Sequence, residues 1–177
     1  ATFTGDDAFA WAGGVAGPHF AVQGNILVSE ETVQAMAQTF IEQQTSGQGE
    51  LADHLITTLT AGQAAGGDSR GMQSAALVVV RQGGGYSGYN DRYVDLRVDD
   101  HPSPIAELRR ILHLHHRYFQ DTAPANLFPI QGESLPEIRE LLQAAGFLIT
   151  VPAKSSYDPA TTAAVEQFTG RANSEPR

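Results

Sequence analysis

The sequence contains no cysteine. Disulfide bonds, catalysis by a thiolate and zinc sites built on cysteine are therefore excluded. Long apolar runs are missing as well, since the longest extends only from Ala75 to Val80. A transmembrane helix needs about 20 apolar residues, so the sequence predicts no membrane span.

Positive charge is scarce in this chain. Its 177 residues include 11 Lys and Arg against 20 Asp and Glu, which gives a net charge of −9 at pH 7. So acidic a protein repels phosphate backbones, and we expect no nucleic-acid partner. The absence of a recognisable signal segment leaves the compartment open and slightly favours the cytoplasm. Hydrophobic residues make up 41% of the chain, which is enough for a folded core and excludes wholesale disorder.

Hydrophobic periodicity predicts an α+β domain over residues 1–121. Strands are expected within residues 1–28, apart from a turn-rich stretch at 12–18, and at residues 74–81 and 93–98. Helices are expected to begin at an N-cap Ser29, near Glu50 and at Ser103-Pro104. The continuous apolar run in the strand at 74–81 is typical of a strand buried on both faces.

A small helical module is expected over residues 126–177, after a linker at 122–131. Its first helix is marked by a capping box, Ser134 followed three residues later by Glu137, and is stopped by Gly146. Asp158-Pro159 marks the start of a second helix. Two helices make only a small core, so the module is expected to lean on a neighbour.

Two segments of the first domain carry candidate binding groups. Asp68-Ser69-Arg70 follows two glycines; either its amides and Arg70 hold an anion, or Asp68 and Arg70 satisfy a local turn. Asp95, Arg97 and Asp99 share one face of a strand. They bind either an ammonium group or a divalent cation, or they form an ion-pair network.

Other polar residues have structural explanations as well as functional ones. His101 is either a general base or the cap of a turn. His113 and His116 lie three positions apart, but a solvated helix end explains them better than a metal ion. Asn25, Gln73 and Ser74 are interpreted as polar residues at a sheet end, where they bind a ligand or satisfy local hydrogen bonds.

Three motifs in this order resemble one known family. Residues 21–27 (AVQGNIL), 66–77 (GGDSRGMQSAAL) and 94–102 (VDLRVDDHP) match a family of unknown function with an N-terminal-nucleophile (Ntn) hydrolase-like fold, whose members often carry a pilin label. The resemblance implies a four-layer αββα domain that is incomplete at its N-terminus. The tail resembles a peptidoglycan-binding module, although Ser155-Ser156 stands where such modules usually have Asp-Gly.

The resemblance implies hydrolysis of an amide or another non-peptide C–N bond. Ntn hydrolases use the side chain and amine of their first residue, and Ala1 offers no nucleophilic atom, so the chain lacks the nucleophile segment. It would supply the groups that bind a small amide substrate, with His101 as the catalytic candidate and neither metal nor cofactor. The binding groups expected are Asn25, Asp68, Arg70, Gln73, Ser74, Asp95, Arg97 and Asp99.

A non-enzymatic role is the alternative: a self-assembling scaffold or binding protein with an Ntn-like fold. Either role predicts a partner, because a truncated sheet leaves an unpaired edge that proteins usually cover. We expect a homo-oligomer or a companion N-terminal chain.

Overall fold

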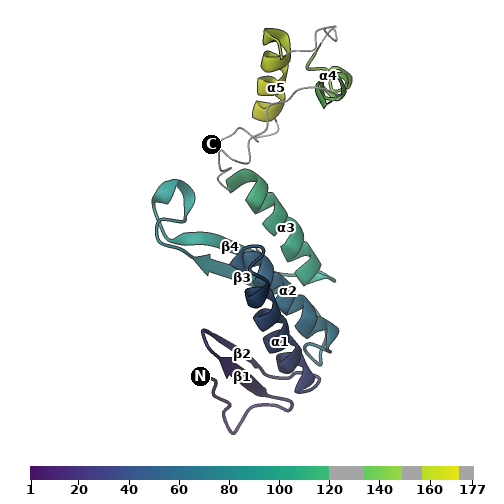
Figure 1. Ribbon diagram of the computed structural model, residues 1–177. Helices are drawn as coiled ribbons and strands as arrows, with labels where there is room; N and C mark the ends of the chain where they lie inside the picture. Colours follow the sequence, from purple (N-terminus) through teal and green to yellow (C-terminus); the bar gives the residue numbers. More distant parts are fainter. Residues whose placement is uncertain (120–133, 149–156, 172–177) are drawn as a thin grey trace. The chain divides into compact units, whose positions relative to one another are not determined.

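The computed structural model describes residues 1–119, 134–148 and 157–171. The chain forms two compact units, Ala1–His115 and His116–Arg177, and each is described by itself (Figure 1). The described residues contain five α-helices and two small antiparallel sheets, which is a mixed α and β composition. None of the described helices is both long and apolar enough to cross a bilayer.

The first sheet is a hairpin of β1 (Gly13–Gly17) and β2 (Phe20–Gly24), paired from Gly13↔Gly24 to Gly17↔Phe20. The turn predicted at residues 12–18 is therefore wrong, because most of this stretch is a strand. Its glycines serve packing: a Cβ on Gly13 would lie 2.5 Å from the ring of Trp11, and one on Gly17 would collide with the ring of Phe20.

Two antiparallel helices follow, α1 (Glu31–Ser46) and α2 (Leu51–Ala64). The predicted N-cap at Ser29 is off by one position, since Glu30 occupies it without a capping side chain. The predicted stop is confirmed, because Gly47 adopts the left-handed conformation at φ 63°. Buried His54 holds the connection through its two ring nitrogens, which contact Gln44 Nε2 at 3.0 Å and the Gln48 carbonyl at 2.5 Å.

The second sheet pairs β3 (Ala75–Val80) with β4 (Arg92–Val98), on either side of a loop with a short 3₁₀ turn, η1 (Tyr86–Gly88). Leu77 and Val79 are buried, but Val78 and Val80 are 55% and 67% exposed. The expectation that this strand is covered on both faces is therefore wrong. The described residues cover one face only.

The main core lies between this sheet, α2 and α3 (Pro104–Phe119). Ile56, Val94, Leu108 and Leu112 are fully buried there. A smaller core joins the first sheet to α1 through Val22, Val33 and Ala37. The two sheets are not hydrogen-bonded to each other, and the four-layer αββα arrangement remains a prediction.

The second unit contains α4 (Ser134–Ala144) and α5 (Pro159–Arg171), as the sequence predicts. Gly146, at φ 78°, follows α4, and Asp158 caps α5 by accepting 3.0 Å hydrogen bonds from the amides of Ala160 and Thr161. Arg139 is 1% exposed and donates to Asp158 Oδ2 and to Thr161 Oγ1. The predicted linker at 122–131 lies outside the described residues.

Candidate functional site

The loop at residues 66–74 is held in place by a short piece of extra strand pairing. Asp68 forms an isolated antiparallel bridge with Leu27, in which the Val28 amide donates to the Gly67 carbonyl and the Ser69 amide to the Ile26 carbonyl. Leu27 is in turn paired with Trp11 through 3.2 and 2.9 Å hydrogen bonds. The loop is therefore fixed to the first sheet at one end and continues into β3 at the other.

Asp68 and Arg70 form a bidentate ion pair on this loop. Arg70 Nε and Nη2 donate to Asp68 Oδ1 and Oδ2 at 2.9 and 2.7 Å, and the Arg70 amide donates to Oδ1 at 2.8 Å. The Arg70 side-chain hydrogen bonds, helped by its amide, lower the pKa of Asp68 to about 2, while Asp68 raises the pKa of Arg70. Two of the five guanidinium N–H groups are used in this way, which leaves three for a ligand.

A polar cavity of about 500 Å³ opens beside this pair. Three segments form it: the end of α2, the loop and the connection from β4 to α3. The amide of His101 donates to the Gln73 carbonyl at 2.9 Å and joins the last two segments. The cavity is lined by Gln63, Asp68, Arg70, Gly71, Met72, Gln73, Ser74, Asp100, Pro104 and Ile105.

The strand-face residues do not line this cavity. Asp95 pairs with Arg92, and Arg97 Nε lies 2.7 Å from Asp99 Oδ1 with both side chains more than 70% exposed. The structure thus brings Asp68, Arg70, Gln73 and Ser74 together and leaves Asp95, Arg97 and Asp99 as surface ion pairs. Asn25 is exposed and also lies outside the cavity lining.

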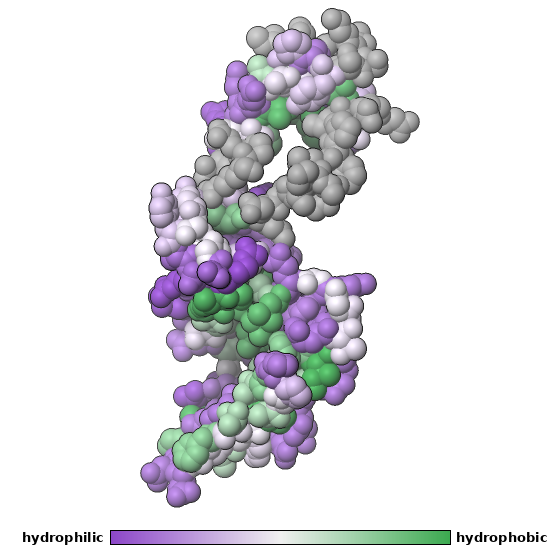
Figure 2. All heavy atoms as spheres, turned by 60° about the vertical axis from the view of Figure 1, so that its left-hand side comes forward, coloured by the Kyte–Doolittle hydropathy of each residue, from purple (hydrophilic) through white to green (hydrophobic). Residues whose placement is uncertain are grey.

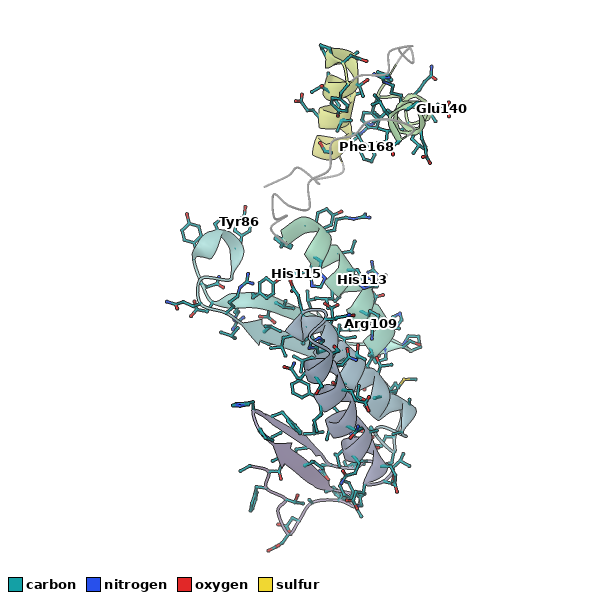
Figure 3. All side chains as sticks on the ribbon, in the orientation of Figure 1. Tyr86, Arg109, His113, His115, Glu140 and Phe168 are labelled. Atoms are coloured by element: carbon teal, nitrogen blue, oxygen red, sulfur yellow. The ribbon has the colours of Figure 1, made fainter. Side chains whose placement is uncertain are left out.

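The histidines occupy structural positions. His101 Nδ1 accepts a 3.0 Å hydrogen bond from the Ser103 amide, which is the turn-capping alternative. Figure 3 shows His113 and His115 on different sides of α3; His113 is exposed, and the ring of His115 packs edge-on against Tyr93 at 5.8 Å. Within the described ranges, no three His, Asp or Glu side chains are grouped closely enough to hold a metal ion.

Asp100 and Gln63 are cavity residues that the sequence analysis did not select. Asp100 is one of three aspartates within residues 95–100, so its residue type indicated a binding role, but strand alternation did not indicate where its side chain points. Gln63 is half-buried near the end of α2, and no local sequence pattern distinguishes it from the other polar residues of this helix.

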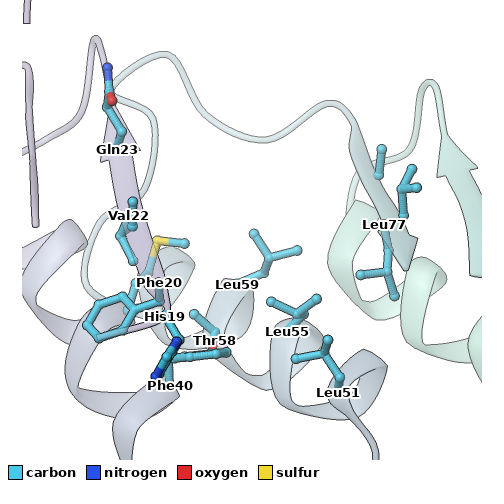
Figure 4. Close-up of a pocket in the computed structure, with 14 residues that line it drawn as sticks. His19, Phe20, Val22, Gln23, Phe40, Leu51, Leu55, Thr58, Leu59 and Leu77 are labelled. Atoms are coloured by element: carbon cyan, nitrogen blue, oxygen red, sulfur yellow. The ribbon is translucent and has the colours of Figure 1, made fainter. Parts of the chain in front are cut away.

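A second hollow, of about 540 Å³, lies between β2 and β3, and we call it the β2–β3 groove (Figure 4). The two strands form its sides, and apolar residues of α1 and α2 form its floor. In the space-filling view of Figure 2, hydrophobic surface is visible in the middle of the first unit. The groove is lined by His19, Phe20, Ala21, Val22, Gln23, Met36, Phe40, Leu51, Leu55, Thr58, Leu59, Ala76, Leu77 and Val78.

Residues 1–108, which contain the cavity, the groove and the loop that joins them, match the model of a family of unknown function, DUF1028. The chain belongs to this family. A crystal structure of a DUF1028 protein from Silicibacter pomeroyi, SPO2555, is similar with a TM-score of 0.53 and 25% sequence identity, over 64% of this chain and 46% of that one. The chain thus spans less than half the length of that DUF1028 relative. No curated protein matches it.

Proposed function

We propose that this DUF1028 chain forms the substrate-binding part of an Ntn-type hydrolase that cleaves an amide or another non-peptide C–N bond. The observation that carries the proposal is the polar cavity at the 66–74 loop. There, the remaining N–H groups of Arg70 and the carboxylate of Asp100 offer opposite charges across a space of small-molecule size. The reaction class itself is inferred from the resemblance of the three motifs to a family with an Ntn hydrolase-like fold. It is thus an inference from fold and not from the geometry of the cavity.

The cavity supplies binding groups for each part of a small amide. Arg70 suits a carboxylate, because guanidinium pairs with carboxylates through charge-assisted hydrogen bonds. Asp100 suits an ammonium or amide N–H, and Gln73 and Ser74 offer neutral donors and acceptors. Ser74 is the hydroxyl-bearing residue among the described lining residues, and no hydrogen bond joins its side chain to a basic group. The attacking group is therefore assigned to a companion segment.

The remaining predicted site residues take lesser parts in this proposal. Asn25 stands next to Ile26, which accepts the hydrogen bond from Ser69, so we assign it to the rim of the cavity. Asp95, Arg97 and Asp99 are assigned to the charged surface, and His101 to positioning the turn that carries Asp100.

A non-enzymatic binding or assembly role is the second candidate. The exposed Val78 and Val80 and the apolar β2–β3 groove favour it, because monomeric proteins rarely leave connected apolar surface uncovered. Under this alternative the protein binds a partner chain or a second copy. The tail, which resembles a peptidoglycan-binding module, would add a further binding surface.

Binding of two small probes tests the cavity. N-acetylglycine carries an amide and a carboxylate, and glycinamide carries an amide and an ammonium group. We expect Arg70→Met to weaken N-acetylglycine binding at least about tenfold, the loss typical of a charge-assisted hydrogen bond, and to leave glycinamide binding intact. Arg97→Met is the matched control, because Arg97 is equally exposed and also forms a 2.7 Å ion pair, away from the cavity.

Calorimetric titration of both probes distinguishes the outcomes. An equal loss of N-acetylglycine binding in the two variants, or none in either, would contradict the assignment of Arg70. Binding of neither probe by the unaltered chain would favour the assembly role.

A further inference from the structure

The two strands beside the β2–β3 groove have unpaired edges. Within the part of the chain that the structure describes, β2 pairs only with β1 and β3 only with β4. Figure 4 shows the sides of β2 and β3 that face each other across open space. Proteins usually protect such edges with proline, charged residues or a covering element. Neither FAVQG in β2 nor AALVVV in β3 contains a proline or a charge.

The floor of the groove is apolar and partly exposed. Leu51, Leu55 and Leu59 of α2 face it, and Leu51 is 46% exposed. Thr58 also lines it, is only 5% exposed, and its Oγ1 has no hydrogen-bond partner among the described residues. A buried hydroxyl without a partner is unusual in a folded protein, and here it lies beside an open groove.

We propose that the β2–β3 groove receives an extended polypeptide segment, which adds as a strand to the free edge of β3. This is recognition by strand addition, in which main-chain hydrogen bonds supply affinity and alternate side chains enter pockets. The alternate side chains would contact the leucines of α2 that line the groove.

The geometry favours a strand over a second folded copy. β2 closes the far side of the groove, α1 packs on the first sheet and α2 packs on β3, so a second copy would have to enter the groove without the helices that cover its own strands. The greater length of the DUF1028 relative indicates where such a segment would come from. The Silicibacter pomeroyi relative has more than half of its chain outside the matched 46%, and we infer that polypeptide of this unmatched part is the occupant.

A strand-forming peptide tests this inference on the whole chain. The probe is a capped nonapeptide, DRYVDLRVD, which copies residues 91–99 and contains the strand that already pairs with β3 on its other side. We expect saturable binding and slower amide hydrogen exchange in residues 75–80. The same peptide with N-methyl groups on alternate residues cannot form the ladder and is expected not to bind.

Two matched substitutions locate the site. Val78 and Val80 lie on the same strand and are both exposed, but only Val78 lines the groove. Val78→Gln is expected to weaken peptide binding about tenfold, because the bound peptide would no longer bury an apolar valine side chain at this position. Val80→Gln is expected to bind like the unaltered chain.

Several results would overturn the inference. The N-methylated peptide could bind as well as the unmodified one, the two substitutions could have equal effects, or the peptide could give no exchange protection. Protection of residues 75–80 by sodium decanoate, an apolar molecule without a peptide backbone, would also overturn it. Sedimentation that shows a dimer with these amides already protected would favour a second copy. The hydrolase proposal is tested independently of this one. Arg70 lines the polar cavity and not the groove, so Arg70→Met is expected to leave peptide binding unchanged.

Discussion

Replacing Thr58 with valine should stabilise the first unit. Thr58 is 5% exposed, and its Oγ1 has no partner among the described residues, so folding removes the hydroxyl from water without compensation. Such a loss costs about 1–3 kcal/mol in proteins. Valine has the same branched shape and nearly the same helix propensity. We therefore expect Thr58→Val to raise the free energy of unfolding by about 1 kcal/mol, the lower end of that range.

Thr57→Val is the matched control in the same helix. Thr57 Oγ1 donates to the Asp53 carbonyl at 2.9 Å, so its replacement loses a hydrogen bond and is expected to give no gain. Urea denaturation followed by circular dichroism measures both, with the midpoint shifting at constant slope. A destabilised Thr58→Val variant would refute the reasoning, because it would mean that the hydroxyl has a partner in the free chain.

Two further predictions concern ion pairs. Asp68 has a folded-state pKa of about 2, below its ordinary value of 3.8, so its pairing with Arg70 should add stability above about pH 5 that is lost as the pH falls toward 2. Asp68→Asn should flatten this part of the stability profile, measured by urea denaturation at stepped pH, and an unchanged profile would contradict the pairing. In the second unit, Arg139→Met should leave Asp158 partly buried without its guanidinium. Arg139 is 1% exposed and donates to both Asp158 and Thr161, so its loss removes buried hydrogen bonds at the start of α5. Amide exchange in α5 should therefore become faster, whereas unchanged exchange would show that the pair is not needed.

Helix ends could be predicted from the sequence because their determinants are local. Gly47 takes a left-handed conformation that residues other than glycine rarely adopt. Asp158-Pro159 carries both the capping carboxylate and a proline whose φ angle is already fixed near the helical value. The strand at Gly13–Gly17 could not be predicted in the same way. Its glycines make room for the rings of Trp11 and Phe20, and this is a requirement of packing that no local pattern displays.

The candidate site was predicted in part for a related reason. The glycines before Asp68 indicated a special loop, and the structure gives Gly66 and Gly67 positive φ angles of 122° and 64°. Strand alternation then pointed to Asp95, Arg97 and Asp99. However, β4 ends at Val98, and alternation no longer governs the residues beyond it. Asp99 turns back to Arg97, while Asp100 reaches the cavity.

The polar cavity and the β2–β3 groove meet at the start of β3. Ser74, just before β3, lines the cavity, and Ala76, within β3, lines the groove, so one residue separates the two linings along the chain. A segment that pairs along β3 therefore has one of its ends beside Gln73 and Ser74. The hydrolase proposal needs an attacking group brought to this place, and the end of an added strand would bring it there with fixed direction. The two proposals are thus joined by geometry, although Arg70→Met and Val78→Gln test them one at a time.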